Sequence, residues 1–401
     1  MARVKLFVLA GFLAGMALAA WMWETGLAHE NGGSGAGQGD AARRGGQAYA
    51  AVRGGRAGTA GGEMAVPAGD GFFPDESDRP RGGAGSVQER PSEGRKSVPE
   101  PEEEELLVRV YLTGERRTET VPLEDYVMGV VAAEMPVGFP QEALEAQALA
   151  ARTYIVRRLV KGDRSGVPDK VAEAADVTDT TIHQRYRPLE QMRRMQKDDP
   201  DGWAKVRRAV EAPRGRVLVF DGEPIQALYF STSNGYTEAS EEVFPFALPY
   251  LRSVESPWDK SGAPRSKETT EMPLADFYRK LGISVTPAAI RKGKAPKIRV
   301  AEWTQGRRVR TLQVGDTRLA GTEVREKLGL RSTAFSWETD GGRIAITTRG
   351  SGHGVGMSQW GARFMAEEGY TAEQIVRHYY SGVAVEEVSK IWSPADKFPS
   401  L

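Results

Sequence analysis

Residues 30–105 contain so few β-branched and aromatic side chains that they have little with which to build a hydrophobic core. Gly, Ala, Arg, Pro, Ser and Glu dominate this stretch, and burying such residues does not repay the conformational entropy lost on ordering. The stretch ends in Pro99, Pro101 and the acidic run 102–105, which proline stiffness and charge repulsion keep extended. The sequence therefore predicts a disordered linker over 25–105 and a folded part that begins at Leu106.

An apolar segment at the N-terminus predicts how the chain is anchored. The uncharged run 6–23 follows Arg3 and Lys5, and its length approaches the roughly 20 apolar residues that cross a bilayer as a helix. The positive-inside rule places the basic end in the cytoplasm and the rest of the chain outside it. We therefore expect a transmembrane anchor over 1–24. A signal peptide cleaved near Ala20 is the alternative, and it leads to the same compartment.

Charge balance and cysteine content exclude some classes of function. Lys plus Arg and Asp plus Glu both number 54, so no basic field attracts nucleic acid, and we expect no nucleic-acid partner. The chain has no cysteine, which excludes disulfides and thiolate metal sites. We expect neither a cofactor nor a structural zinc ion.

The folded part mixes helical and strand patterns, which predicts the α+β class. Helical periodicity over 123–159, broken at 135–139, predicts two antiparallel helices joined by a tight connection. Strands over 217–220 and 227–230 flank a turn and predict a β-hairpin. We expect a single domain over 106–394, in which the helical pair packs on antiparallel β structure. Its other expected elements are strands over 106–112, 298–300, 308–314 and 343–347, an exposed helical excursion over 190–212, and a C-terminal helix over 371–379.

Glu134 stands out because it continues the apolar stripe of the first predicted helix. At about 100° per residue, its side chain points in nearly the same direction as Leu123. Desolvation and the negative end of the helix dipole, just before Pro136, would both raise the pKa of this carboxyl, as a general acid requires. The alternative is that the helix frays before Glu134 and the carboxylate points into water.

Three further features are candidates for binding a substrate: a helical arginine, a polar turn and a glycine-rich segment. Arg152, at the edge of the stripe on the second helix, faces Glu134 or a substrate, or else extends along the surface with its charge in water. Residues 229–237 (YFSTSNGYT) form a turn that suits sugar hydroxyls, although the same residues are ordinary turn formers. Segment 350–362 is rich in glycine around His353 and Gln359. Such backbone is often approached closely by a ligand or another strand, and a purely structural loop is the alternative.

Together these motifs resemble the family of the stage II sporulation protein D and its relatives, the amidase enhancers. They run in order through nearly all of residues 106–390, and the last is long enough to be highly specific. The matching stretches are GVVAAEMP at 129–136, AQALAARTY at 146–154, TIHQRY at 181–186, residues 229–244, residues 319–335 with GLRST, and SGHGVGMSQWGA at 351–362.

The resemblance implies a lytic transglycosylase that cuts peptidoglycan glycan strands already stripped of stem peptides and leaves 1,6-anhydro ends. Such an enzyme acts in the cell membrane at the sporulation septum, beside a sporulation amidase and a membrane partner of the engulfment machinery. In this family the glutamate of the AAEMP motif, here Glu134, is acid and then base, and Arg152 positions substrate or carboxylate. The resemblance also implies substrate contacts from Tyr154, His183, Gln184, Tyr186, Ser231, Asn234, Tyr236, His353 and Gln359.

Three alternatives remain open at this point. In the first, the domain binds glycan without cutting it, as an amidase enhancer does. In the second, Asp176 or Asp179 supplies a second carboxylate, and the enzyme hydrolyses its substrate as ordinary two-carboxylate glycosidases do. The third is a metallohydrolase built on His183, His353 and His378, which is disfavoured because no H-x-x-x-H spacing is present.

The chain departs from the family pattern in two places. Some members hold a metal with histidine and cysteine around the segment that corresponds to His183, and this chain lacks cysteine. A turn that many relatives write with two glycines is Asn234 and Gly235 here, although asparagine tolerates left-handed backbone well.

Overall fold

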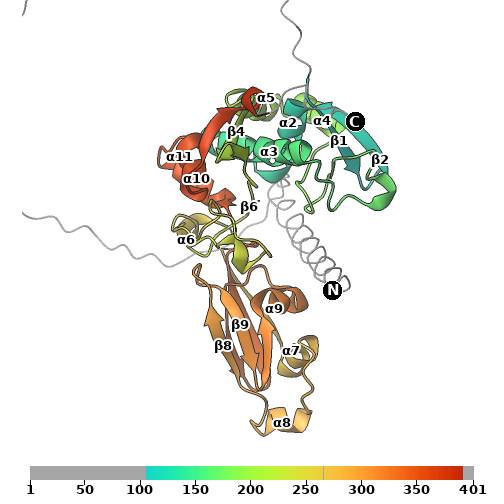
Figure 1. The fold of residues 1–401 in the computed structure, drawn as a ribbon. Helices are drawn as coiled ribbons and strands as arrows, with labels where there is room; N and C mark the ends of the chain where they lie inside the picture. The colour runs from blue at the N-terminus through green and yellow to red at the C-terminus, as the bar shows by residue number, and fades with distance from the viewer. Residues whose placement is uncertain (1–104, 265, 392–401) are drawn as a thin grey trace, which may run out of the picture. The chain divides into compact units, whose positions relative to one another are not determined.

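The computed structural model describes residues 105–264 and 266–391. The anchor predicted over 1–24 and nearly all of the predicted linker lie outside these ranges. Within them, no helix is both long and apolar enough to cross a membrane. The described chain contains both helices and mostly antiparallel sheets, which confirms the α+β class (Figure 1).

One hydrophobic core forms around α3 (Gln141–Lys161), which contacts α2 (Leu123–Glu134), α5 (Pro200–Glu211) and β4 (Arg216–Phe220) (Figure 1). The chain around this core further contains β1 (Leu107–Leu112), β2 (Arg117–Pro122), β3 (Val177–Thr178), α4 (Leu189–Asp198), β5 (Glu223–Pro224), β6 (Tyr229–Phe230), α6 (Asp259–Gly262), β13 (Met357–Ser358), α10 (Gln359–Glu367), α11 (Ala372–Tyr379), β14 (Ala384–Glu387) and 3₁₀ turns at Asp169–Val171, Ser240–Glu242 and Val388–Lys390.

A second hydrophobic core lies in the segment between α6 and β13, and Leu312, Val324 and Ile344 are fully buried in it. Its elements are β7 (Lys267–Pro273), α7 (Leu274–Lys280), α8 (Pro287–Arg291), β8 (Ile298–Trp303), β9 (Val309–Val314), β10 (Thr317–Ala320), α9 (Gly321–Leu328), β11 (Phe335–Asp340) and β12 (Arg343–Arg349).

The sheets are mostly antiparallel, as expected, but two pairs are parallel. In the second core the strand orders are β10-β9-β8 and β11-β12-β7, and all of these pairs are antiparallel. In the first core, β1 pairs antiparallel with β2 and parallel with β3, and β14-β4-β5 is antiparallel. The second parallel pair joins β6 to β13.

The predicted pair of helices is confirmed, and its ends follow from local chemistry. Helix α2 begins after Pro122 and ends at Glu134, because Met135 precedes a proline and adopts extended backbone, with φ −122° and ψ 140°. Helix α3 ends at Lys161, and the following Gly162 has a φ of 59°, the left-handed conformation that glycine adopts without strain.

The predicted hairpin is correct in its first strand and turn but wrong in its second strand. Asp221 and Gly222 have φ values of 50° and 78°, and they lead directly into β5, which pairs antiparallel with β4. After Pro224, Ile225 N still donates to Leu218 O at 3.0 Å, but Leu218 N donates to Thr153 Oγ1 at 2.8 Å, so the ladder goes no further. The expected strand over 227–230 contributes only β6, which pairs with β13 instead.

The expected exposed excursion over 190–212 also needs correction. It forms α4 and α5, but Met192, Met195, Val206 and Val210 are buried, and α5 packs against α2 and α3. The segment is amphipathic, and its apolar face belongs to the first core.

A close approach at Gly129 brings the chain after β3 against α2. A Cβ atom on Gly129 would lie 2.4 Å from the ring of Tyr186, and Arg187 N donates to Gly129 O at 3.1 Å. Only glycine leaves room for this contact. As a result, the segment around Arg185 lies beside the C-terminal end of α2.

Candidate active site

The Glu134 side chain is turned into the structure at the end of α2. Its Oε1 accepts a hydrogen bond from Arg185 N at 2.8 Å. Gln359, the first residue of α10, donates through Nε2 to Glu134 O at 3.2 Å and lies 3.4 Å from Oε2. The alternative in which the helix frays and the carboxylate points into water is therefore wrong, because the helix includes Glu134 and two distant segments hold its carboxyl.

Opposing effects set the acidity of this group. Burial raises the pKa of Glu134, while the Arg185 N–H, the Arg185 charge, Gln359 and the Tyr229 hydroxyl lower it, and the net direction is upward. The residue as a whole keeps some exposed surface. Burial of the carboxyl thus favours its protonated form, in a residue that is not wholly enclosed.

A polar chain lies behind the carboxyl. Tyr126 donates its hydroxyl proton to Gln184 Oε1 at 3.1 Å, and Gln184 Nε2 donates to Tyr229 Oη at 3.2 Å. The ring of Tyr126 stacks on Tyr186 at 5.4 Å, and the Tyr186 hydroxyl donates to Glu119 at 2.8 Å. Gln184 and Tyr186 therefore lie behind the site and support it.

Several of these partners were missed as site residues. The spacing of Tyr126 along α2 indicates only a core position, although a fully buried tyrosine requires a hydrogen-bond partner for its hydroxyl. Gln147, fully buried on α3, accepts from Gln359 Nε2 at 3.5 Å. A polar amide within the apolar stripe of a helix is a signal that sequence reasoning could have used.

Arg152 is not beside Glu134, so the expectation that it faces that carboxyl is wrong. It is fully buried and forms an ion pair with Glu124, with Nη2 2.6 Å and Nε 2.9 Å from the carboxylate oxygens. It also donates to Val210 O at 3.0 Å and Arg216 O at 3.3 Å. The guanidinium thereby joins the start of α2 to the end of α5 and to β4.

His183 supports the chain that precedes Gln184, whereas Tyr154 lies beside Arg158 on its own helix. Burial raises the pKa of Tyr154 to about 12, and Arg158 lies 5.9 Å from its ring. His183 has both ring nitrogens engaged, with Nδ1 3.1 Å from Thr178 N and Nε2 2.9 Å from Ser165 O. Burial lowers the pKa of His183 to about 4, so the ring is neutral.

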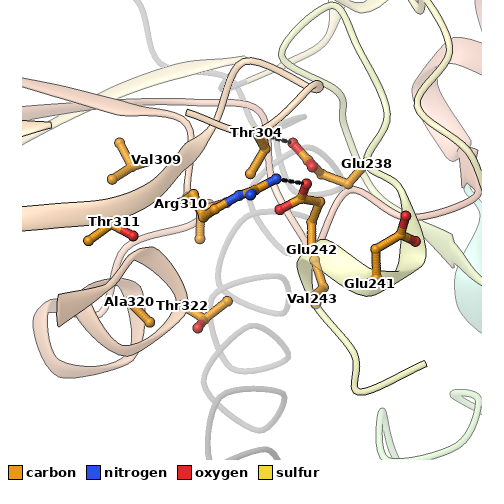
Figure 2. A pocket seen from close by; sticks show the side chains of 11 residues that line it. Glu238, Glu241, Glu242, Val243, Thr304, Val309, Arg310, Thr311, Ala320 and Thr322 are labelled. Atoms are coloured by element: carbon orange, nitrogen blue, oxygen red, sulfur yellow. Dashed lines mark hydrogen bonds and ion pairs between the residues drawn. The ribbon is translucent and has the colours of Figure 1, made fainter. Parts of the chain in front are cut away.

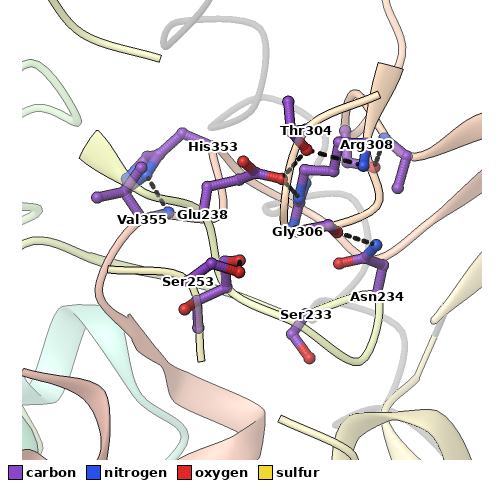
Figure 3. Close-up of polar contacts among 12 residues, drawn as sticks. Ser233, Asn234, Glu238, Ser253, Thr304, Gly306, Arg308, His353 and Val355 are labelled. Atoms are coloured by element: carbon purple, nitrogen blue, oxygen red, sulfur yellow. Dashed lines mark hydrogen bonds and ion pairs between the residues drawn. The ribbon is translucent and has the colours of Figure 1, made fainter. Parts of the chain in front are cut away.

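The turn expected to bind sugar contacts another part of the chain. The Ser231 carbonyl accepts from Trp360 N at 3.0 Å, and Asn234 Nδ2 donates to Gly306 O at 3.0 Å (Figure 3). The guanidinium carbon of Arg307 lies over the Tyr236 ring, 4.1 Å from the ring centroid. Asn234 and Tyr236 thus contact the turn between β8 and β9, whereas Ser231 contacts α10 within the first core.

The glycine-rich segment carries Gln359 to the site. At Gly356, φ is 78° and a Cβ atom would lie 2.0 Å from Leu228 O, so the two chains run side by side as β6 and β13. His353 lies between Phe230 and Phe244, at 5.8 and 5.7 Å between ring centroids. Burial lowers the pKa of His353 to about 3, which makes it a neutral packing residue.

A cavity of about 350 Å³ opens elsewhere, between the 238–243 segment and β9 (Figure 2). Glu238, Glu242, Arg310 and four threonines contribute to its lining, which does not include Glu134. Behind it, Thr304 donates to Glu238 at 2.6 Å, and the buried Arg308 lies 3.5 Å from the same carboxylate (Figure 3). Because the cavity is separate from the Glu134 carboxyl, we do not assign the chemistry to it.

The other candidate carboxylates and histidines are dispersed. Asp176 forms an ion pair with Arg109 at 2.6 Å, and Asp179 accepts from Thr113 N at 3.0 Å. His378 Nε2 lies 2.7 Å from Glu255 O. Within residues 105–264 and 266–391, no three His, Asp or Glu side chains come together as metal ligands.

Comparisons with known proteins agree with the motifs. A model of the family described as Stage II sporulation protein matches residues 111–220. Stage II sporulation protein D of Bacillus amyloliquefaciens is 42% identical over 302 residues, covering 75% of this chain and 85% of that protein. Its namesake in Bacillus subtilis (strain 168) is 42% identical over 283 residues, covering 70% and 79%. The amidase enhancer of Bacillus subtilis (strain 168) is 28% identical over 305 residues, covering 64% of this chain and 40% of the enhancer.

Proposed function

Because this chain belongs to the stage II sporulation protein D family, we propose that it is a lytic transglycosylase that cleaves denuded peptidoglycan strands between the muramoyl and glucosaminyl units. The observation that carries the proposal is the Glu134 carboxyl, partly desolvated, with a raised pKa and with both oxygens held by neighbouring groups. A general acid needs a proton at working pH and a fixed direction for donating it.

In the proposed mechanism a single carboxyl serves both half-reactions. Glu134 transfers its proton to the glycosidic oxygen while the bond from that oxygen to the anomeric carbon breaks and an oxocarbenium-like centre develops. The muramoyl C6 hydroxyl then bonds to this carbon and gives its proton back to the Glu134 carboxylate. The intramolecular attack yields the 1,6-anhydro ring without a second nucleophile. Asp176 and Asp179 have structural partners, which favours this route over two-carboxylate hydrolysis.

We further propose that the enzyme works at the outer face of the cell membrane, beside two protein partners. The apolar run over 1–24 is a membrane anchor with a cytoplasmic N-terminus, residues 25–105 are a linker, and the catalytic domain over 106–394 lies outside the cytoplasm at the sporulation septum. The sequence pattern supports this arrangement. A sporulation amidase that strips stem peptides and a membrane partner of the engulfment machinery act beside it.

Product analysis tests the proposal. The purified chain, incubated with denuded glycan, should release anhydro-ended fragments detectable by mass spectrometry, and Glu134→Gln should abolish release while binding persists. Glu145→Gln is the matched control, because burial also raises the pKa of Glu145 but its side chain pairs with Gln141 on α3. A Glu134→Gln variant that cuts as fast as wild type would refute the mechanism.

The second candidate function is that of a glycan-binding amidase enhancer, which the similarity to the Bacillus subtilis enhancer favours. In that case neither wild type nor Glu134→Gln releases anhydro ends, and both stimulate an added amidase equally.

A further inference from the structure

The chain passes from the first core to the second and back again, and one hydrogen bond joins the two crossings. The outgoing chain runs through α6, whose first residue is Asp259, and the returning chain runs through β13, whose last residue is Ser358. Ser358 Oγ donates to Asp259 Oδ1 at 2.7 Å, and neither residue has exposed surface. The bond therefore holds together the places where the second-core segment leaves and returns.

Asp259 is a fixed anchor, because it accepts hydrogen bonds on both carboxylate oxygens. Oδ1 also accepts from Ser233 N at 3.1 Å, and Oδ2 accepts from Ser233 Oγ at 2.7 Å and from Ser256 Oγ at 2.8 Å. Tyr379 supports Ser256, with 2.9 Å between the two hydroxyl oxygens. Turning the carboxylate would leave several buried groups unpaired, which is costly. Ser358 is therefore attached to a point that cannot easily move.

Ser358 transmits this constraint to the first turn of α10. Its Oγ accepts from Gly361 N at 3.2 Å and so caps the helix. Its single proton goes to Asp259, since the other acceptor, Ser231 O, lies farther away at 3.5 Å. The turn also fits tightly, because a Cβ atom on Gly361 would lie 2.0 Å from Tyr379 Oη and 3.0 Å from Asp259 Oδ2. The start of the helix is thus held in place.

Gln359 is the residue that this turn places at the candidate active site. Its Nε2 donates to Glu134 O at 3.2 Å and lies 3.4 Å from Glu134 Oε2. Both distances are near the upper limit for a hydrogen bond, so a displacement of about 0.5 Å would break the contact. We propose that Ser358 is a positioning residue: held by Asp259, it fixes the start of α10 and keeps the Gln359 amide on the Glu134 carboxyl. The inference deepens the proposed function and rests on it, because Glu134 is the proposed acid.

Loss of the Gln359 contact should change both the direction and the acidity of the carboxyl. Hydrogen bonds to the charged form of a carboxyl lower its pKa, and Gln359 lowers the pKa of Glu134 in this way. The other groups that act on this carboxyl are Arg185, through its N–H and its charge, and the Tyr126 and Tyr229 hydroxyls. None of them is replaced in the test below, so a higher pKa of Glu134 reports a displaced Gln359.

A second serine makes matching bonds to Asp259 and provides the control. Ser233 is also buried, donates to the same carboxylate at 2.7 Å and accepts from a glycine N–H, that of Gly235, at 3.1 Å. Ser358→Ala and Ser233→Ala should therefore destabilise the chain to a similar extent, each lowering the melting temperature by about 3–10 °C. Only Ser358 is followed directly by the residue that contacts Glu134.

The measurements are the kinetics and pH profile of anhydro-end release by the full chain and the 13C-NMR titration of the Glu134 carboxyl, assigned with Glu134→Gln. Ser358→Ala should lower kcat about tenfold, and it should move the alkaline limb of kcat/KM and the titration midpoint up by about half a pH unit. Ser233→Ala should move neither the limb nor the midpoint. In a Gln359→Met background, Ser358→Ala should cause no further shift, because its effect passes through Gln359.

Equal kcat values and equal midpoints for the two serine variants would overturn the inference, because Ser358 would then contribute only to stability. A Ser358→Ala shift that persists undiminished in the Gln359→Met background would overturn it as well. If Ser358→Ala does not fold, Ser358→Gly replaces it and is expected to give the same shifts. Glycine begins a helix almost as well as serine, so this variant loses chiefly the bond to Asp259.

The NMR titration separates this inference from the proposed function, since it does not require cleavage. Shifts as predicted in a chain that releases no anhydro ends would refute the proposed reaction but not the positioning role. Cleavage that is abolished in Glu134→Gln and unaffected by Ser358→Ala, with an unchanged midpoint, would refute the positioning role alone.

Discussion

Arg152 gives the sharpest test of the difference between the family expectation and the structure. Arg152→Met leaves the Glu124 carboxylate, whose side chain is 15% exposed, without its cation, and removes donors from two backbone carbonyls. Breaking a buried pair from one side costs about 3–5 kcal/mol, and the residual exposure of Glu124 favours the lower end. With about 2–4 °C per kcal/mol, calorimetric melting of the purified chain should show a loss of roughly 6–12 °C.

The controls separate a structural role from a substrate role. Arg157→Met, on the same helix, loses a single bond to Pro224 O and should cost no more than about 1 kcal/mol. Adding Glu124→Leu to Arg152→Met should recover much of the stability, because apolar replacement of a whole buried pair is often neutral. If Arg152→Met melts at the same temperature as the wild type yet loses glycan cleavage, the guanidinium acts on the substrate and the structural role is refuted.

Three further predictions concern pH and backbone. Burial raises the pKa of Glu238 from 4.5 to about 7, so the folded chain retains a proton that the unfolded chain releases, and stability should fall as pH rises through this window. In urea unfolding, the Glu238→Gln variant should lack this decline, which amounts to roughly 3 kcal/mol of unfolding free energy in the wild type. Identical pH slopes for the two chains would contradict the prediction. Burial lowers the pKa of His353 from 6.5 to about 3, so stability should fall as pH drops through that range, and His353→Gln should show a shallower loss. Gly356→Ala, whose Cβ would lie 2.0 Å from Leu228 O, should unfold at lower urea than Gly369→Ala, which has a similar positive φ in open space; equal midpoints would refute the close approach.

Local patterns account for the helical pair and for the inward direction of Glu134. Pro122 and Pro136 bound α2, and the apolar period of the helix carries Glu134 on its buried face. Both signals lie within a few residues of what they predict. The polar groups around Glu134 leave a weaker signal in the sequence. Arg185 contributes a backbone N–H, which any residue provides, and Tyr126, which donates to Gln184, has the spacing of an ordinary core residue.

The wrong partner for β6 has the same origin. Tyr229–Phe230 follows a convincing turn, and nearest-neighbour pairing is the usual outcome for such a strand. Its actual partner, Met357–Ser358, lies beyond the whole second core, and the pairing depends on the absence of a side chain at Gly356. Parallel pairing between segments so far apart leaves no local periodicity to detect.

If the proposed chemistry is correct, possession of the glutamate does not by itself make a member of this family an enzyme. Desolvation by the core raises the pKa of Glu134, while Arg185, Gln359 and Tyr229, each from a different segment, lower it. Two of these segments reach the carboxyl only through close approaches at Gly129 and Gly356. We expect a relative that keeps the carboxyl but loses one of these approaches to carry an acid whose surroundings no longer favour proton donation. The balance between cutting and merely binding would then depend on backbone contacts away from the reacting atoms.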